Sequence, residues 1–289
     1  MNSQTVSFCC PICHNQLKLT EKSYRCENGH CYDLAKSGYV NLLLSNKMNS
    51  KTPGDNKLMV DTRNHFLNKG YYQPLLDALC NQITTLAKNR NQKKIVLADA
   101  GCGEGYYTTG MYKALTNEGY FATILGVDIS KRALELASKR AKLEQLTNLN
   151  YAVGSVFDLP IATKSCDVLT ELFAPYSGEE YRRVLKKDGI MVLVIPAENH
   201  LYELKQAVYE QSYKNEVKPY ELEGFTLLEK RRVTERITLE DNQDIQNLFM
   251  MTPYYYKTSK TDTDKLFALN TLTTTIDFEI LCYQVASES

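Results

Sequence analysis

The chain has 289 residues, of which 43% are hydrophobic and 24% are charged. This composition is that of an ordinary globular protein, and it excludes a disordered chain, a collagen-like chain and a coiled-coil rod. The 34 Lys and Arg residues balance the 34 Asp and Glu residues, which excludes a globally basic nucleic-acid binder but not a local basic face. No apolar run approaches the roughly 20 residues that cross a bilayer, and residues 1–8 do not resemble a signal peptide. We therefore expect a cytoplasmic protein with no membrane partner.

Five of the nine cysteines lie within residues 9–31, in a segment too short to bury a core of its own. The spacing C-x2-C-x12-C-x3-H is formed by Cys10, Cys13, Cys26 and His30. Three thiolates and one imidazole fill the coordination shell of zinc, which is typical of a structural site. Two alternatives remain open, because Cys9 could replace Cys10 and Cys31 could replace His30. We expect a zinc-binding module at residues 1–45 and a linker with helices at residues 46–88.

From residue 94 onward, short apolar strands alternate with helices, which predicts parallel strands joined by right-handed crossovers. The expected strands lie at residues 94–99, 122–128, 150–153, 167–173, 190–196, 225–239 and 273–285. The expected helices lie at residues 57–88, from the glycine loop to about 115, and at 131–143, 179–187, 200–211, 244–251 and 262–269. Residues 89–289 are therefore expected to form an α/β domain with a seven-stranded, mostly parallel sheet.

A glycine-rich loop, Gly101-Cys-Gly103-Glu-Gly105, directly follows the first of these strands and opens a helix. Its G-x-G-x-G form differs from the dinucleotide fingerprint and lacks the Gly-Lys-Ser/Thr of a phosphate-binding loop. Such a turn lets a ligand approach the backbone closely at a helix N-terminus. Asp128 ends the second strand, where a carboxylate can accept both ribose hydroxyls of a nucleoside. The arrangement suits S-adenosylmethionine, which has a nucleoside and an amino acid but no phosphate.

A third segment, residues 154–160, has an equivalent in class I methyltransferases that borders the adenine. Together with the loop and Asp128, it predicts a class I (Rossmann-like) S-adenosylmethionine-dependent methyltransferase fold. The residues expected to bind this cofactor are Asp99, Gly101, Gly103, Asp128, Ser155 and Val156. The alternative to cofactor binding is a purely structural role, in which the glycines only make a tight turn and Asp128 caps the next helix.

Several further segments carry a resemblance that covers nearly the whole chain. They are CPIC at 10–13 with the later Cys26 and His30, KSGYVNLLL at 36–44, PGD at 53–55, GYYQPL at 70–75, DAGCGEGYYT at 99–108, FAP at 173–175, HLYELK at 200–205, LEGFTL at 222–227 and MTP at 251–253. In these segments the chain resembles the RlmA-type 23S rRNA (guanine-N1)-methyltransferases. Zinc module, linker and catalytic domain also occur in the order of that family.

The resemblance implies methyl transfer from S-adenosylmethionine to N1 of a guanine in a hairpin loop of 23S rRNA, with RNA recognition by the zinc module. It implies that zinc is held by Cys10, Cys13, Cys26 and His30. It also implies that the methyl donor is contacted by Tyr72, Gly103, Glu104 and His200. Without the resemblance, Tyr72 would be interpreted as helix packing and His200 as the start of a helix.

The acceptor is expected at Phe173, Ala174 and Pro175, which end the fourth strand, where methyltransferases usually contact their acceptor. Phe173 is a candidate for stacking on a base or, alternatively, for core packing. The Ala174 carbonyl is a candidate acceptor for the guanine N1–H. Glu171 and Asp158 are candidate bases, and the sequence assigns neither of them.

Two other functions fit part of the pattern. A small-molecule methyltransferase would use the same donor motifs but would not need the zinc segment, and the glycine loop argues against a non-catalytic zinc-dependent RNA-binding factor.

We expect that removal of residues 1–45 abolishes RNA methylation while donor binding survives. The sequence leaves open which guanine is modified and whether the chain forms a homodimer. Basic residues that could contact RNA are Lys18, Lys22, Arg25, Lys36, Lys47, Lys51 and Lys57.

Overall fold

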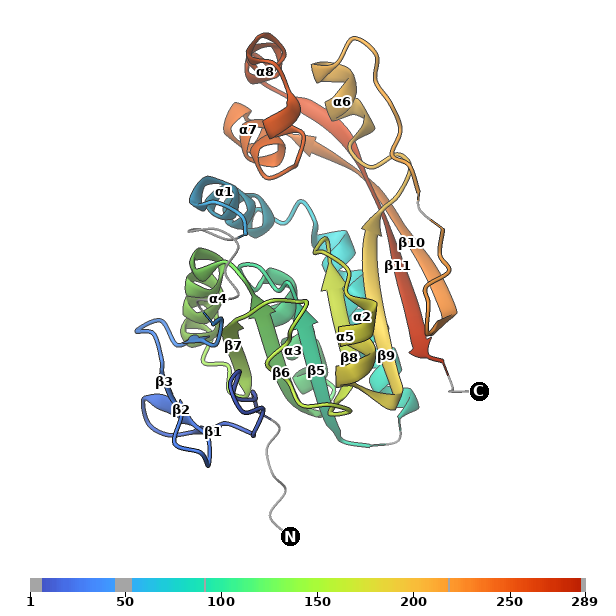
Figure 1. Ribbon diagram of the computed structural model, residues 1–289. Coiled ribbons are helices and arrows are strands. Elements are labelled where there is room, and N and C mark those ends of the chain that lie inside the picture. The colour runs from blue at the N-terminus through green and yellow to red at the C-terminus, as the bar shows by residue number, and fades with distance from the viewer. Residues whose placement is uncertain (1–6, 45–53, 91, 218, 287–289) are drawn as a thin grey trace.

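The computed structural model describes residues 7–44, 54–90, 92–217 and 219–286. Its centre is a sheet with the strand order β10-β11-β9-β8-β5-β6-β7-β4 (Figure 1). The five parallel strands that follow the predicted alternation are β5 (Lys94–Ala100), β6 (Phe121–Asp128), β7 (Leu149–Val153), β8 (Cys166–Leu172) and β9 (Leu185–Pro196). Within the described residues, no helix is long and apolar enough to span a membrane.

The prediction of seven strands is wrong by one, because the sheet has eight. The additional strand, β4 (Val40–Asn41), comes from the N-terminal segment and pairs in parallel with β7. Without it, β7 would be an edge strand with unpaired backbone N–H and C=O groups. The short cysteine-rich segment therefore completes the sheet of the α/β domain.

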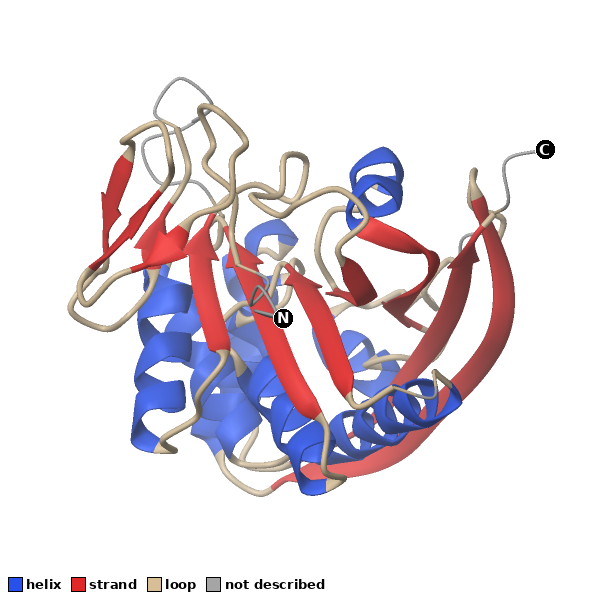
Figure 2. Ribbon diagram, turned by 90° about the horizontal axis from the view of Figure 1, so that it is seen from below, coloured by secondary structure: helices blue, strands red, loops and turns tan. Residues whose placement is uncertain are grey.

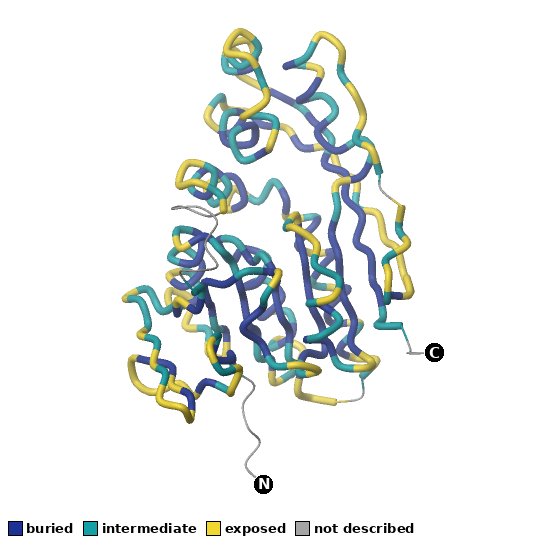
Figure 3. Tube along the Cα trace, in the orientation of Figure 1, coloured by how far each residue is buried: buried dark blue, intermediate teal, exposed yellow. Residues whose placement is uncertain are grey.

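The parallel strands are buried along most of their length, which explains why they are nearly continuous apolar runs (Figure 3). All residues of β8 are buried. One hydrophobic cluster contains the apolar faces of α2 (Gln73–Asn89), α3 (Tyr106–Asn117) and α4 (Lys131–Leu143). A second cluster contains α5 (Gly178–Val184) together with buried residues of the N-terminal segment.

Three predicted helices differ from the observed ones by a division or by three residues at one end, whereas the others agree to within two residues. The helix expected at 57–88 is divided into α1 (Lys57–Asn68) and α2, because Gly70 adopts a left-handed φ of 82° between them. The helix expected at 179–187 ends earlier, since Leu185 already pairs with Cys166 in the sheet. The helix expected at 200–211 shortens to α6 (Tyr202–Val208), because Leu201 also has a positive φ, of 55°.

The C-terminal part of the chain forms a long antiparallel hairpin of β10 (Phe225–Leu239) and β11 (Leu272–Val285). Only Phe278–Gln284 of β11 pairs with β9, so the hairpin extends past the sheet. This extension carries α6, α7 (Asn242–Met250), a 3-10 turn at Tyr255–Lys257 and α8 (Lys260–Phe267), which we call the C-terminal lobe (Figure 1). Helix α1 packs against α7 and so lies next to this lobe.

At the opposite edge, residues 7–44 form the zinc module. Its small antiparallel sheet has the strands β1 (Lys18–Leu19), β2 (Ser23–Arg25) and β3 (Cys31–Asp33). The module lies beside β7, as the second view also shows (Figure 2). The two edges of the central sheet are therefore formed by very different elements. One edge is a strand of the short cysteine-rich segment, and the other is a long hairpin.

Candidate active site and metal centre

Four side chains of the zinc module converge on one point. The ligand atoms of Cys10, Cys13, Cys26 and His30 all lie within 4.8 Å of one another. The Cys13 and Cys26 sulfurs are 3.7 Å apart, and His30 Nδ1 lies 3.3 Å from Cys26 Sγ and 3.5 Å from Cys10 Sγ. A zinc tetrahedron with Zn–S bonds of about 2.3 Å has sulfur–sulfur edges of about 3.8 Å. The donor set and its spacing therefore fit zinc, bound through His30 Nδ1.

The two alternative ligands lie outside this cluster. Cys9 is buried, and its backbone N–H donates to the Pro160 carbonyl oxygen at 2.7 Å, while Cys31 is exposed. The geometry thus favours Cys10 over Cys9 and His30 over Cys31. The basic residues Lys18, Lys22, Arg25, Lys36 and Lys57 are exposed, whereas Lys47 and Lys51 lie outside the described residues.

The glycine loop after β5 is held by backbone hydrogen bonds to the end of β6. The N–H groups of Gly101 and Cys102 donate to the Val127 carbonyl at 2.8 and 3.1 Å. Gly101 has a φ of 81°, and a side chain there would collide with the Cβ of Ala174. Glycine is therefore required at this position both by the backbone conformation and by the close approach of the segment after β8.

The same loop leaves room for a ligand. Gly103 has a φ of 55°, and no atom lies within 4 Å of the position that a Cβ would occupy. Nearby, the Tyr107 hydroxyl is buried without a hydrogen-bond partner among the described residues, and Tyr107 interacts electrostatically with Tyr72 and Glu104. An open backbone cradle with an unpaired hydroxyl fits a polar ligand such as S-adenosylmethionine.

Asp128 and Asp99 hold this loop from two sides. The Asp128 carboxylate accepts from Gly103 N at 2.9 Å and from Ser130 N at 2.7 Å, and burial raises its pKa. Each of its oxygens keeps a further lone pair for a ligand hydroxyl. Burial raises the pKa of Asp99 to about 6, although hydroxyls donate to both of its oxygens, from Thr108 at 2.6 Å and Thr170 at 2.8 Å. Asp99 therefore stabilises the loop through its hydrogen bonds with Thr108 and Thr170.

Glu104 is buried beside an arginine that sequence reasoning missed. Burial raises the pKa of Glu104, and the Arg63 guanidinium opposes this shift. Arg63 comes from α1 and forms an ion pair with Asp55 at 2.5 Å. Its charge also acts on Asp128 and Tyr72. Arg63 carries no local signal in the sequence, because its partners lie on other elements.

Tyr72 and His200 meet on the side of the site that faces the C-terminal lobe. The Tyr72 hydroxyl lies 3.5 Å from His200 Nε2, and both rings pack against Phe278. Burial and the nearby Lys205 charge lower the pKa of His200 to about 3, so the ring is neutral at physiological pH. The backbone N–H of Asp277 donates to His200 Nδ1 at 3.2 Å. The neutral ring therefore carries its proton on Nε2, which points at Tyr72.

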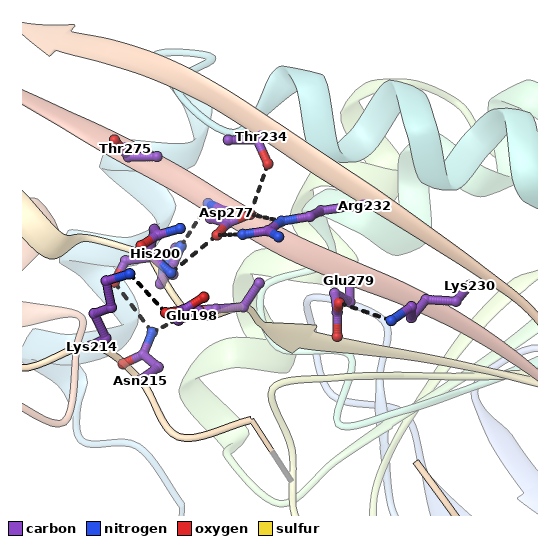
Figure 4. Close-up of polar contacts among 12 residues, drawn as sticks. Glu198, His200, Lys214, Asn215, Lys230, Arg232, Thr234, Thr275, Asp277 and Glu279 are labelled. Atoms are coloured by element: carbon purple, nitrogen blue, oxygen red, sulfur yellow. Dashed lines mark hydrogen bonds and ion pairs between the residues drawn. The ribbon is translucent and has the colours of Figure 1, made fainter. Parts of the chain in front are cut away.

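The buried carboxylate of Asp277 stabilises the position of His200 through a group of hydrogen bonds (Figure 4). Arg232 donates to Asp277 through two nitrogens, at 2.6 and 2.8 Å. Thr234 Oγ1 donates to the same carboxylate at 2.8 Å, and Asn199 N donates at 3.1 Å. Although burial opposes it, these hydrogen bonds lower the pKa of Asp277. The loop that presents His200 is thus tied to β10 and β11.

Ser155 and Val156 lie in the turn after β7. The Ser155 hydroxyl accepts from Phe157 N at 3.2 Å, and Val156 is buried in the hydrophobic cluster that includes the zinc module. Gly154 N donates to the Asp128 carbonyl at 3.0 Å, so the turn starts next to the carboxylate that holds the glycine loop. These contacts bring the predicted donor residues of β5, β6 and β7 to one end of the sheet.

The predicted acceptor segment lies directly against the glycine loop. Phe173 has a left-handed φ of 60° and an exposed fraction of 48%, with its ring 5.4 Å from that of Phe278. This exposure favours stacking over core packing. The Pro175 carbonyl accepts from the Tyr181 hydroxyl at 3.1 Å. The segment is therefore a fixed turn with one aromatic ring presented outward.

Glu171 shapes this turn from within the sheet. Its Oε1 accepts from Ala174 N at 2.6 Å, and burial raises its pKa to about 8. At neutral pH the carboxyl is largely protonated, which makes it unsuited to the role of base and suited to holding Ala174. Asp158 is less buried and lies in the turn with Ser155, to which it forms a backbone bridge.

Comparison with known proteins adds to this geometry. The family described as "RlmA, N-terminal" matches residues 8–51, and a family described as "Methyltransferase domain" matches residues 91–250. The chain is 31% identical over 284 residues to the Bacillus subtilis (strain 168) protein named "Putative 23S rRNA (guanine-N(1)-)-methyltransferase YxjB", with 95% of each chain covered. The chain belongs to the 23S rRNA (guanine-N1)-methyltransferase family. Within this family assignment, strands β5 to β11 form the class I S-adenosylmethionine-dependent methyltransferase fold.

Other relatives are similar over a smaller part of the chain. The Streptomyces fradiae 23S rRNA (guanine(748)-N(1))-methyltransferase is 32% identical over 200 residues, which cover 69% of this chain and 66% of the relative. The crystal structure of the YcgJ protein from Bacillus subtilis has a TM-score of 0.47 and 15% identity, and covers 71% of this chain and 97% of its own. The latter likeness is too distant to bear on function.

Proposed function

We propose that this chain transfers a methyl group from S-adenosylmethionine to N1 of a guanine in a hairpin loop of 23S rRNA. The observation that carries the proposal is the packing of Gly101 against Ala174, because the proposed donor loop and the proposed acceptor segment touch at these two residues. Methyl transfer depends above all on alignment of the nucleophile with the methyl group, and two rigid segments in contact supply that alignment.

On the donor side, we assign contacts to the backbone of Gly101 and Gly103 and to the Asp128 carboxylate, braced by Asp99. The turn at Ser155 and Val156 would border the nucleobase. Glu104, Tyr72 and His200 would surround the amino-acid end, where the Arg63 guanidinium supplies a positive charge. S-adenosylmethionine, when bound, supplies the electrophilic methyl group.

On the acceptor side, the exposed ring of Phe173 is positioned to stack on an unstacked guanine. The Ala174 carbonyl is the proposed partner of the guanine N1–H, and Pro175 fixes the turn. Guanine N1 would gain the methyl group as the methyl–sulfur bond of the donor breaks, and it would release its proton to solvent water. Because Glu171 holds Ala174 and is largely protonated, we assign it a positioning role and not that of the base.

The zinc module supplies the remaining part of the proposal. We propose that Cys10, Cys13, Cys26 and His30 hold zinc and that the module contacts the RNA through its exposed basic residues. In this division, residues 1–45 recognise RNA, residues 46–88 form a linker and helices that contribute Tyr72 and Arg63 to the donor site, and residues 89–289 carry the rest of that site. A small-molecule methyltransferase would need no such module.

Labelled S-adenosylmethionine tests the proposal directly. The purified chain is incubated with total bacterial RNA from a strain that lacks the enzyme, and half of each sample is treated with RNase. We expect label in 23S rRNA that RNase removes. Label in RNase-resistant small molecules would instead support the small-molecule alternative, and donor binding without any transfer would support a non-catalytic RNA-binding factor.

A further inference from the structure

The zinc module shares its hydrophobic core with the donor site. The buried side chains of Phe8 and Leu42 belong to one cluster with Val156 and Leu159, which lie in residues 154–160. We call residues 154–160 the donor-side loop. A segment as short as the module cannot bury enough apolar surface by itself, so its order depends on this shared core and on the metal.

The far end of the donor-side loop is attached to the metal site. Cys9 N donates to the Pro160 carbonyl at 2.7 Å, and Phe8 forms a backbone bridge with Ile161. The next residue, Cys10, is a proposed zinc ligand. A single peptide unit therefore separates the metal cluster from the hydrogen bond that fixes the end of the loop.

The near end of the loop is attached to the same module. Leu42 N donates to the Val153 carbonyl at 3.0 Å, which continues the β4–β7 pairing. The first residue of the loop, Gly154, directly follows Val153 and donates its N–H to the Asp128 carbonyl, and the Asp128 carboxylate accepts from Gly103 N. The zinc module thus holds both ends of the loop, and backbone contacts continue from there to the glycine loop.

We propose that metal binding by the zinc module fixes the donor-side loop, so that zinc and the methyl donor bind with positive coupling. This inference rests on the proposed function for the identity of the donor. Structural zinc sites contribute folding free energy directly, so metal loss would release Phe8 and Cys9 from the far end of the loop and β4 from β7. Donor binding would then have to order the loop at an entropic cost. On this proposal, the donor binding that we expect to survive removal of residues 1–45 would be weaker than in the full-length chain.

Calorimetry with S-adenosylmethionine tests the coupling on the full-length chain. We compare the zinc-loaded protein with protein stripped by a chelator and expect the affinity to fall by at least about five-fold on stripping, the lower end of typical coupling factors. Equal affinity in both forms would overturn the coupling. Absence of binding to the zinc-loaded protein would overturn the proposed function instead, so the two failures are distinguishable.

The reciprocal measurement does not require a stable metal-free protein. Coupling must act equally in both directions, so saturating S-adenosylmethionine must raise zinc affinity by the same factor. Competition with a chromogenic chelator measures that affinity with and without the donor. An unchanged competition curve would contradict the proposal even if the stripped chain unfolds.

A matched pair of variants locates the coupling in one hydrogen bond. Cys9→Pro removes the N–H that binds Pro160, whereas Cys9→Ala keeps it and removes only the thiol. We expect Cys9→Pro to retain zinc but bind the donor more weakly, and Cys9→Ala to bind both as the wild type does. Equal donor affinity in the two variants would overturn the role of this contact, and if Cys9→Pro does not fold, the chelator competition decides.

Discussion

The two edges of the central sheet are stabilised by different interactions. At the zinc edge, β4 has two residues and depends on a four-ligand cluster and a shared apolar core. At the other edge, β10 pairs along its length with β11, and helices α7 and α8 bury their own apolar side chains, such as Phe249 and Leu266. One edge therefore depends on a metal, and the other depends on apolar area and on the ion pair between exposed Arg232 and buried Asp277. The candidate site lies between them and depends on both.

Loss of a zinc ligand should have the largest effect, which we expect at the zinc edge and the donor-side loop but not in the C-terminal lobe. Cys26→Ser removes one thiolate of the cluster, and we expect zinc affinity to fall by more than about 100-fold, beyond the range seen for residues that merely orient ligands. Chelator competition measures this, and limited proteolysis should show cleavage before residue 45 while the C-terminal lobe stays protected. The control Cys31→Ser changes an exposed thiol outside the cluster. Equal proteolysis of both edges would contradict the comparison.

A second substitution tests the point at which donor and acceptor segments meet. Gly101→Ala places a Cβ against Ala174 and also imposes a left-handed residue, whose cost alone is about 1–2 kcal/mol. Gly119→Ala has the same left-handed cost, at a φ of 78°, but no atom within 4 Å of the new Cβ. We expect both variants to lose stability in urea, with the larger loss for Gly101→Ala, and only Gly101→Ala to lose donor affinity. Equal losses of stability and of donor affinity in the two variants would show that the contact between Gly101 and Ala174 is not the cause.

Arg232→Ala tests the opposite edge. It leaves the fully buried Asp277 carboxylate without its charged partner, and we expect a loss of about 1–3 kcal/mol in the free energy of unfolding. Arg231→Ala, at the neighbouring exposed position, should change stability by less than about 0.5 kcal/mol. Zinc affinity should be unchanged in both variants. A weakened zinc site in Arg232→Ala would show that the two edges are not independent.

The last expected effect is a pH dependence from His200, which is absent near neutral pH and appears only in acid. Its pKa is about 3 in the folded chain against an ordinary value of 6.5, so the unfolded chain binds more protons between these values. The contribution of His200 to the free energy of unfolding is therefore fully present above about pH 6.5 and is lost as the pH falls toward 3. Comparing urea unfolding of wild type and His200→Asn should show a stability difference that narrows over this range. A constant difference would mean that His200 does not stay neutral.

Local patterns in the sequence predicted much of the fold. The bounds of α4 (131–143) and β10 (225–239) agree with the structure, because amphipathic periodicity and strand alternation are local properties. The two-residue β4 has no such pattern and exists only because β7 needs a partner. The end of α5 was predicted too late for the same reason, since pairing with β8 recruits Leu185 into the sheet.

The site divides in a similar way. The glycine loop, Asp128 and the cysteine cluster were predicted, because their chemistry depends on residues close together in the chain. Arg63 and Asp277 were not, since the groups they act on, Glu104 and Arg232, lie on distant elements. His200 was expected only from family resemblance, and its tautomer follows from a backbone N–H that no sequence pattern indicates.

The most direct test of the account is the identity of the modified nucleoside. Ribosomal RNA from a strain that lacks the enzyme is incubated with the pure zinc-loaded chain and S-adenosylmethionine, digested to nucleosides and analysed by mass spectrometry. We predict 1-methylguanosine, formed stoichiometrically in 23S rRNA and absent without the donor. Methylation of another base, of another guanine atom, or of no RNA at all would contradict the central claim.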